Sequence, residues 1–450
     1  MRAPSSGRIK VLTITIPSTG HYVLANANVP AAVMGEPASG ALILVDIEIA
    51  DGKVTSLGAA GSAPLGPDRI DLDHGIVLPA FVDLHTHLDK GHIWPRKENP
   101  DGTWLGALMA VGEDRTANWA AADVERRMDF ALRCAWAHGT AAVRTHIDSA
   151  PPQHEISWDV FEAVRERWVG RIELQAAGLM GPDTILDPAA LRAVATRTKA
   201  AKGLLGGSTG VHPDNPAIMR ALLEVAGDFG LDVDLHIDET GDPAADALQS
   251  LADAVIETGF AGKVTAGHCC AIAIQPEATA MATIERVAQA GIAVVSLPIC
   301  NMYLQDRRNV GGVRTPRWRG VTLLNELKAA GVPVAIASDN TRDPFYAYGD
   351  LDGFEVLREG ARILHFDHPQ ADAFTWARSV STEPAAIGGF TYSGMIGIEL
   401  PAELVLFRAR TWTELMSRPQ TDRVVLRSGA AIDTTLPDYR ELDDLMGRQA

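Results

Sequence analysis

IVLPAFVDLHTH, residues 76–87, is an apolar and partly β-branched run that ends in two histidines. Seven later runs share this design, a short apolar stretch with polar residues at its end. They are TAAVRTHID (140–148), RIELQAAGLM (171–180), GLLGGSTG (203–210), DVDLHIDE (232–239), KVTAGHC (263–269), IAVVSLPICN (292–301) and VPVAIASDN (332–340). The stretches between them, such as AADVERRMDFALRCAWAHG (121–139), place apolar residues at helical spacing. Eight strands that alternate with helices predict an α/β fold, a closed (β/α)8 barrel of the TIM type over residues 75–388.

The two ends of the chain have a different pattern, of short strands separated by turns. Strand-like runs near the beginning are VLTITI (11–16), HYVLANANV (21–29) and ALILVDIEIADGKVTSLG (41–58), and near the end AELVLFRAR (402–410) and RVVLRSGAAI (423–432). Asp51-Gly52 between two alternating runs is typical of a β-hairpin turn. We expect residues 1–74 and 389–450 to form one small β-sandwich domain, with the barrel inserted between its two parts.

Composition and charge exclude several classes of function. The chain has 450 residues, 46% hydrophobic and 22% charged, which is typical of a folded globular protein. Its net charge is −17, from 40 basic and 57 acidic residues, so a nucleic-acid partner is not expected. Apolar runs of the length of a signal sequence or a membrane span are missing, and we therefore expect a cytoplasmic protein. Four cysteines without a CxxC pair predict neither a disulfide framework nor a cysteine metal site.

Polar residues at the strand ends suggest a metal centre. His85 and His87 are two apart on a strand, so both side chains point to the same side. His236 and Asp339 end the fifth and eighth predicted strands, and active sites of such barrels lie at these ends. Three imidazoles and one carboxylate suit Zn²⁺ or Fe²⁺ and leave room for a water, whose pKa a bound metal lowers.

The order of these motifs resembles the amidohydrolase superfamily, and within it the cytosine deaminase branch. The motifs are FVDLHTHLDK (81–90), VRTHID (143–148), DLHIDE (234–239), TAGH (265–268) and ASDNTRDP (337–344). The resemblance implies that His85, His87, His236 and Asp339 bind one divalent metal ion, zinc or iron, with manganese as a further candidate. Binuclear members carry a carboxylated lysine on the fourth strand, and GLLGGSTG has none.

The same resemblance implies the catalytic groups of a hydrolytic deaminase. Glu239 matches the proton shuttle, and His268 matches the histidine that orients the water and stabilises the developing oxyanion. Asp339 has a double role in this scheme, as metal ligand and as base. Ammonia leaves poorly unless it is protonated, so a group that carries a proton from water to the substrate is needed, and such help is worth about 10²–10⁴-fold in rate.

The residues expected to bind substrate differ from those of cytosine deaminases. Gly181, in LQAAGLMGPD (174–183), stands where that branch has a glutamine that binds the amide edge of the pyrimidine. Trp104 and Phe345 also replace residues that line the pocket of that branch, and Lys90 resembles a lysine of the N-isopropylammelide amidohydrolase branch, which removes N-alkyl groups from triazines. We therefore expect a poor cytosine deaminase, acting on another amino- or amide-bearing heterocycle. The other expected substrate-binding residues are Asn301 and Asn340.

Three functions remain open at this point. The first is release of ammonia from an amino-substituted nitrogen heterocycle by a metal-dependent deaminase. The second is cleavage of another C–N bond, in a cyclic amide or at an N-alkyl substituent, which Lys90 favours. The third is a non-catalytic scaffold, which the intact set of ligand residues disfavours. In each case the expected partner is a small heterocyclic molecule, and homo-oligomerisation is left open.

Overall fold

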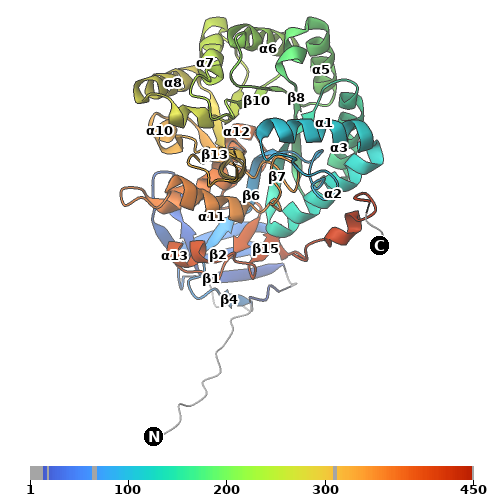
Figure 1. Ribbon diagram of the computed structural model, residues 1–450. Coiled ribbons are helices and arrows are strands. Elements are labelled where there is room, and N and C mark those ends of the chain that lie inside the picture. Colours follow the sequence, from blue (N-terminus) through green and yellow to red (C-terminus); the bar gives the residue numbers. More distant parts are fainter. Residues whose placement is uncertain (1–13, 18–19, 63–67, 308–311, 448–450) are drawn as a thin grey trace.

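A computed structural model describes residues 14–17, 20–62, 68–307 and 312–447. Its central element is a parallel sheet of eight strands in consecutive order (Figure 1). The strands are β6 (Phe81–Thr86), β7 (Thr140–Asp148), β8 (Glu173–Leu179), β9 (Leu204–Thr209), β10 (Val233–Ile237), β11 (Val264–His268), β12 (Ala293–Ser296) and β13 (Val334–Ile336). A parallel bridge between Thr86 and Asp339 joins the last strand to the first, and Asp339 N donates to His85 O at 2.9 Å. The predicted (β/α)8 barrel is confirmed.

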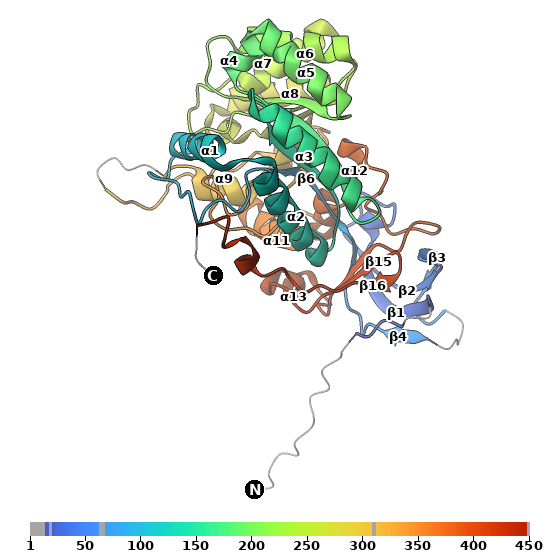
Figure 2. The same ribbon diagram turned by 90° about the vertical axis from the view of Figure 1, so that its right-hand side faces the viewer.

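Helices surround this barrel and bury their apolar faces against it (Figures 1 and 2). In α3, for example, Trp158, Phe161 and Val164 recur at helical spacing and are buried. The helices of this part are α1 (Trp104–Asn118), α2 (Ala121–His138), α3 (Gln153–Trp168), α4 (Pro182–Leu186), α5 (Pro188–Ala200), α6 (Asn215–Phe229), α7 (Ala247–Thr258), α8 (Glu277–Ala290), α9 (Pro298–Leu304), α10 (Leu324–Ala329), α11 (Gly353–Leu364) and α12 (Thr382–Gly388), whereas α13 (Trp412–Ser417) lies beside the strands from the chain ends. None of them is long and apolar enough to cross a membrane, as far as the described residues extend.

The chain ends form a separate part built from two four-stranded sheets. One has the order β3-β2-β1-β4 and the other β16-β15-β14-β5. Their strands are β1 (His21–Pro30), β2 (Leu42–Ala50), β3 (Lys53–Ala59), β4 (Arg69–Asp71), β5 (Val77–Pro79), β14 (Leu404–Leu406), β15 (Val424–Arg427) and β16 (Ala430–Ala431). Tyr22 Oη donates to Gly429 O at 2.5 Å and links the two sheets. The predicted hairpin is confirmed, since β2 and β3 pair across Asp51 and Gly52, whose φ angles of 51° and 78° suit a type I′ turn.

Three details of the sequence analysis are wrong or fall outside the described residues. Val77–Pro79, expected in the first barrel strand, pairs with β14 in the small domain instead. The seventh run does not continue as a strand to residue 301, because β12 ends at Ser296 and Pro298 begins α9. In the expected strand VLTITI, residues 11–13 are not described and residues 14–16 form no strand.

The last described residues pack on the barrel rather than on the small domain. Leu442 and Met446 form a cluster with Phe130 and Cys134 of α2, and the C-terminal segment lies beside α2 in Figures 1 and 2. The carbonyl of residue 445 accepts a hydrogen bond from Arg96 Nη1 at 3.2 Å. The last described residues therefore reach the loop that follows β6.

A buried network of charges braces this loop. Arg96 pairs with Asp114 of α1 and with Asp123 of α2, at 2.8 and 2.5 Å. Asp123 also pairs with Arg127 at 2.6 Å, and Arg127 donates to the backbone carbonyls of Asp89 and Gly91. Lys90 lies between these two carbonyls in the chain, so the network holds the backbone on both sides of it.

Candidate active site

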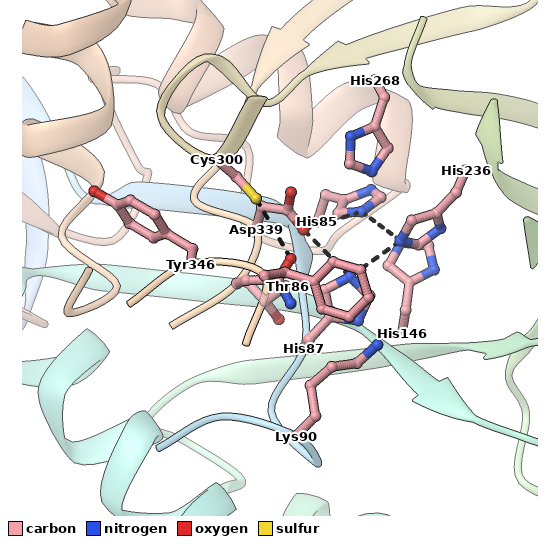
Figure 3. A network of polar contacts seen from close by, with 12 residues as sticks. His85, Thr86, His87, Lys90, His146, His236, His268, Cys300, Asp339 and Tyr346 are labelled. Carbon is pink, nitrogen blue, oxygen red and sulfur yellow. Dashed lines mark hydrogen bonds and ion pairs between the residues drawn. The ribbon is translucent and has the colours of Figure 1, made fainter. Parts of the chain in front are cut away.

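Four side chains from three strand ends meet at one point in the barrel mouth (Figure 3). His85 belongs to β6 and His87 follows it, His236 belongs to β10, and Asp339 follows β13. His236 Nε2 lies 3.1 Å from His85 Nε2 and 3.0 Å from His87 Nε2. Asp339 Oδ1 lies 3.7 and 3.2 Å from the same two histidine atoms. The structure thus brings together the four residues expected as metal ligands, and all four are buried.

The chemistry of this cluster fits a divalent cation. Burial lowers the pKa of His85, His87 and His236 well below the ordinary value, so the rings are neutral and their facing nitrogens offer lone pairs. Among the described residues no N–H or O–H group donates to either oxygen of Asp339. Buried polar atoms are normally hydrogen-bonded, and converging electron-pair donors without protons to share are typical of a metal site. Three imidazoles and one carboxylate suit a borderline ion such as Zn²⁺ or Fe²⁺.

The backbone at or just after these strand ends is strained at three residues. Asp339, His268 and Asp238 have φ angles of 69°, 67° and 51°, in the left-handed region. Such conformations cost about 1–3 kcal/mol each and cluster at functional sites. Gly267 also has a local function, since a Cβ there would lie 2.7 Å from Cε1 of His85. Only a glycine on β11 lets the His85 ring lie this close.

His268 lies beside the cluster and differs from the three expected histidine ligands in what its ring nitrogen offers. Its ligand atom is close to those of His85, His236 and Asp339, so distance alone would allow His268 as a ligand in place of His87. However, Asn301 Nδ2 faces His268 Nδ1 at 3.2 Å, and an amide NH₂ group can only donate. Because burial lowers the pKa of His268 to about 3, the ring is neutral and carries its one proton on Nε2. His268 therefore offers an N–H donor, as expected for a group that stabilises an oxyanion.

A second buried group lies beneath the cluster. The His146 ring packs 4.1 Å from the ring of His85 and 4.5 Å from that of His236. Asp234 Oδ1 lies 3.7 Å from His146 Nε2, and its Oδ2 accepts a hydrogen bond from Arg144 Nη1 at 2.8 Å. No role of His146, Asp234 or Arg144 is predicted from the sequence. His146 thus packs against the rings of two expected ligands, and Asp234 and Arg144 lie on its other contacts.

Glu239 lies at the edge of the cluster and has one well-formed hydrogen bond. Its Oε2 accepts from Trp104 Nε1 at 2.8 Å, and its Oε1 lies 3.6 Å from His268 Nδ1. Burial, and then the nearby Asp339, raise the pKa of Glu239 to about 8. A carboxyl group in this state can hold a proton near neutral pH and release it again, which is what proton transfer requires.

Lys90 is a buried cation in the same cavity. Burial opposes its charge, but Asp148, Asp89 and Asp343 together raise its pKa above the ordinary value, so it stays protonated. Lys90 Nζ lies 3.2 Å from Asp148 Oδ1 and 5.3 Å from the centre of the Phe345 ring. Asp148 also pairs with Arg115 at 3.0 Å. Asp148 ends a predicted strand, but its pairing with Lys90 is not predicted from the sequence.

A cavity of about 770 Å³ opens over these groups. Of the residues expected to bind substrate, Lys90, Trp104, Gly181, Asn340 and Phe345 line it. Asn301 does not, because it belongs to α9 and lies behind His268. One wall is formed by α1, which the sequence analysis does not single out. The cavity residues from α1 are Trp104, Leu108, Met109, Val111, Gly112, Glu113, Arg115, Thr116 and Ala117.

Comparisons with known proteins agree with this geometry. The profile described as Amidohydrolase family matches residues 124–435. A pterin deaminase from Rhizobium rhizogenes is 56% identical over 96% of this chain and 98% of its own length. An N-isopropylammelide isopropyl amidohydrolase from a Pseudomonas species is 23% identical over 76% of this chain and 82% of its own length.

Solved structures show the same fold. A 5-methylcytosine deaminase from Klebsiella pneumoniae, liganded with 5-fluorocytosine, superposes with a TM-score of 0.77 at 24% identity, over 92% of this chain and 98% of that one. An N-isopropylammelide isopropylaminohydrolase from Burkholderia multivorans superposes with a TM-score of 0.71 at 25% identity, over 91% of this chain and 97% of that one.

Proposed function

Because this chain belongs to the amidohydrolase family and is a hydrolase of carbon–nitrogen bonds, we propose that it deaminates a pterin, with one divalent metal ion held by His85, His87, His236 and Asp339. The observation that carries the proposal is the 56% identity to a pterin deaminase over 96% of the chain. The reaction would replace the amino group of the heterocycle by oxygen from water and release ammonia.

The size and lining of the cavity support a substrate larger than cytosine. Ligand pockets measure about 300–1,000 Å³, and a cavity of about 770 Å³ would be mostly empty around a single six-membered ring. A Cβ at Gly181 would have no atom within 4 Å, so the place that a glutamine side chain is expected to take in cytosine deaminases is open space here. Apolar residues such as Leu108 and Met180 also line the cavity, as a fused aromatic ring system requires.

In the proposed mechanism the chain's own residues move two protons. Bound in the cluster, a divalent ion would supply Lewis-acid chemistry. Glu239 takes a proton from the attacking water and gives it to the ring nitrogen beside the amino-bearing carbon. As the new carbon–oxygen bond becomes a carbonyl, the hydroxyl proton passes by way of Asp339 to the amino group, and the C–N bond breaks to release ammonia. The Nε2–H of His268 donates to the oxygen as charge develops on it.

Lys90 favours a second candidate function. Lys90 resembles a lysine of the branch that removes N-alkyl groups. One protein named for that activity is similar to this chain in sequence, and another is similar in structure. In the pterin proposal the Lys90 ammonium binds the ring carbonyl, an acceptor that pterins and triazinones have in common. The higher identity to the pterin deaminase supports the first candidate.

Product analysis across a small substrate panel tests the proposal. We expect the metal-loaded enzyme to release ammonia from pterin, with the absorbance change of the deaminated ring, and to act slowly on cytosine. N-isopropylammelide is the matched probe for the second candidate, since its hydrolysis releases isopropylamine. Faster release of isopropylamine than of ammonia would reverse the assignment, and no turnover of any of the three would refute both.

A further inference from the structure

We infer that Trp104 is a positioning residue for proton transfer: its indole N–H holds Oε2 of Glu239 and leaves Oε1 as the oxygen that carries the proton. This inference rests on the proposed role of Glu239 and gives Trp104 a role other than the stacking surface suggested by its place in the cavity wall. The distance between Trp104 Nε1 and Glu239 Oε2 is 2.8 Å. In the part of the chain that is described, no other hydrogen-bond donor contacts the Glu239 side chain.

The two oxygens of Glu239 are made unequal by their neighbours. An indole N–H can only donate, so the bond to Trp104 favours Oε2 as the acceptor oxygen. Oε1 instead lies 3.6 Å from Nδ1 of His268, which already accepts from Asn301. The unprotonated nitrogen of a neutral imidazole has a single lone pair, and here it accepts from Asn301, so His268 donates no hydrogen bond to Oε1. Among the described residues, Oε2 thus has a donor and Oε1 has none, which favours Oε1 as the oxygen that carries the proton.

Trp104 is itself fixed, so its donor has a defined direction. It is the first residue of α1, and the side chain of Thr103 caps this helix by accepting from Gly106 N. Asp101 Oδ1 holds Thr103 through the backbone N and the hydroxyl, both at 2.8 Å. Asn99 Nδ2 ties the same turn to Pro344 O at 3.0 Å, next to Phe345. The turn from Asn99 to Thr103 thus fixes the start of α1, which carries the indole, relative to the segment of Pro344 and Phe345.

A double-mutant cycle between Trp104 and Glu239 tests the inference. Trp104→Phe keeps an aromatic ring in the wall but removes the donor, and we expect kcat for pterin to fall about 10- to 100-fold, the worth of one hydrogen bond to a charged group. In a Glu239→Gln background the same change should lower kcat less than about 2-fold, because the indole acts through the carboxyl. Leu108→Ala, in the same wall, should raise KM with little change in kcat, and Trp412→Phe on α13 should change neither. An equal loss in both backgrounds, or a change in KM alone, overturns the inference.

A second measurement does not depend on turnover and separates this inference from the proposed function. The chain has nine tryptophans, so ¹⁵N-tryptophan labelling gives a small set of indole N–H resonances, and Trp104→Phe assigns the one that disappears. We expect Glu239→Gln to move this resonance, because the acceptor changes from a carboxyl to an amide oxygen. If wild type does not deaminate pterin but the resonance moves, the proposed function fails and the contact stands. If pterin is deaminated but the resonance does not respond, the positioning inference fails alone.

Discussion

Replacing Glu239 with glutamine separates proton transfer from binding, because the amide keeps the shape of the carboxyl group. The amide oxygen can still accept from Trp104 Nε1, now 2.8 Å from Oε2, so the side chain should stay in place. Glu239 is not one of the four expected ligands, and we expect metal content to remain near one ion per chain. What the variant loses is a group whose pKa burial raises to about 8 and which can therefore take up and release a proton.

The expected loss in kcat is about 10²–10⁴-fold, the usual contribution of a general acid–base group. This corresponds to about 2.7–5.4 kcal/mol in activation free energy. The assay is ammonia release from pterin, with metal content measured by elemental analysis on the same sample. Glu257→Gln is the matched control, since Glu257 lies on the outer helix α7 and pairs with Arg220 on the surface. Retention of more than about a tenth of the wild-type rate would show that another residue transfers the proton.

Three further predictions concern the metal, the substrate and the stability of the barrel. His85→Ala, His87→Ala or His236→Ala should lower bound metal well below one ion per chain by elemental analysis, and chelation of the wild type should abolish ammonia release; full occupancy in these variants would contradict the ligand set. Cytosine should give a kcat/KM below about 10⁵ M⁻¹s⁻¹. A value above this lies well inside the range of evolved enzyme–substrate pairs and would restore a cytosine assignment. Arg144→Met should lower the free energy of unfolding by about 3–5 kcal/mol in denaturant titrations, because it leaves the buried Asp234 carboxylate without its partner, whereas a change below about 1 kcal/mol would mean that Asp234 is neutral or otherwise paired.

The barrel and its expected ligands could be predicted because buried strands leave a strong pattern. An apolar run that ends in a histidine or a carboxylate has few explanations other than a site at the strand end, and His85, His236 and Asp339 all follow it. The sheet to which residues 77–79 belong cannot be predicted locally, because three apolar residues suit either sheet. Their pairing is decided by β14, a strand far away in the sequence.

The finer parts of the site depend on contacts that no local pattern contains. Asn301 was expected in the pocket, yet the turn at Pro298 carries it behind His268. The cavity wall formed by α1 was missed because its apolar residues do not lie on a single face: Leu108 and Met109 are 44% and 57% exposed although they line the cavity. A helix that covers a cavity mouth does not have the one-sided pattern of a helix packed on a core.

The brace on the loop after β6 also gives the site an order of assembly. During synthesis Lys90 is followed by α1 and α2. Arg127, which donates to the carbonyls on both sides of Lys90, lies on α2. The last hydrogen bond to Arg96 comes from the carbonyl of residue 445, after every barrel strand has been synthesised. A nascent chain that has completed its barrel thus still lacks one support of the lysine loop, and the cavity reaches its final shape only after the segment around residue 445 has been made.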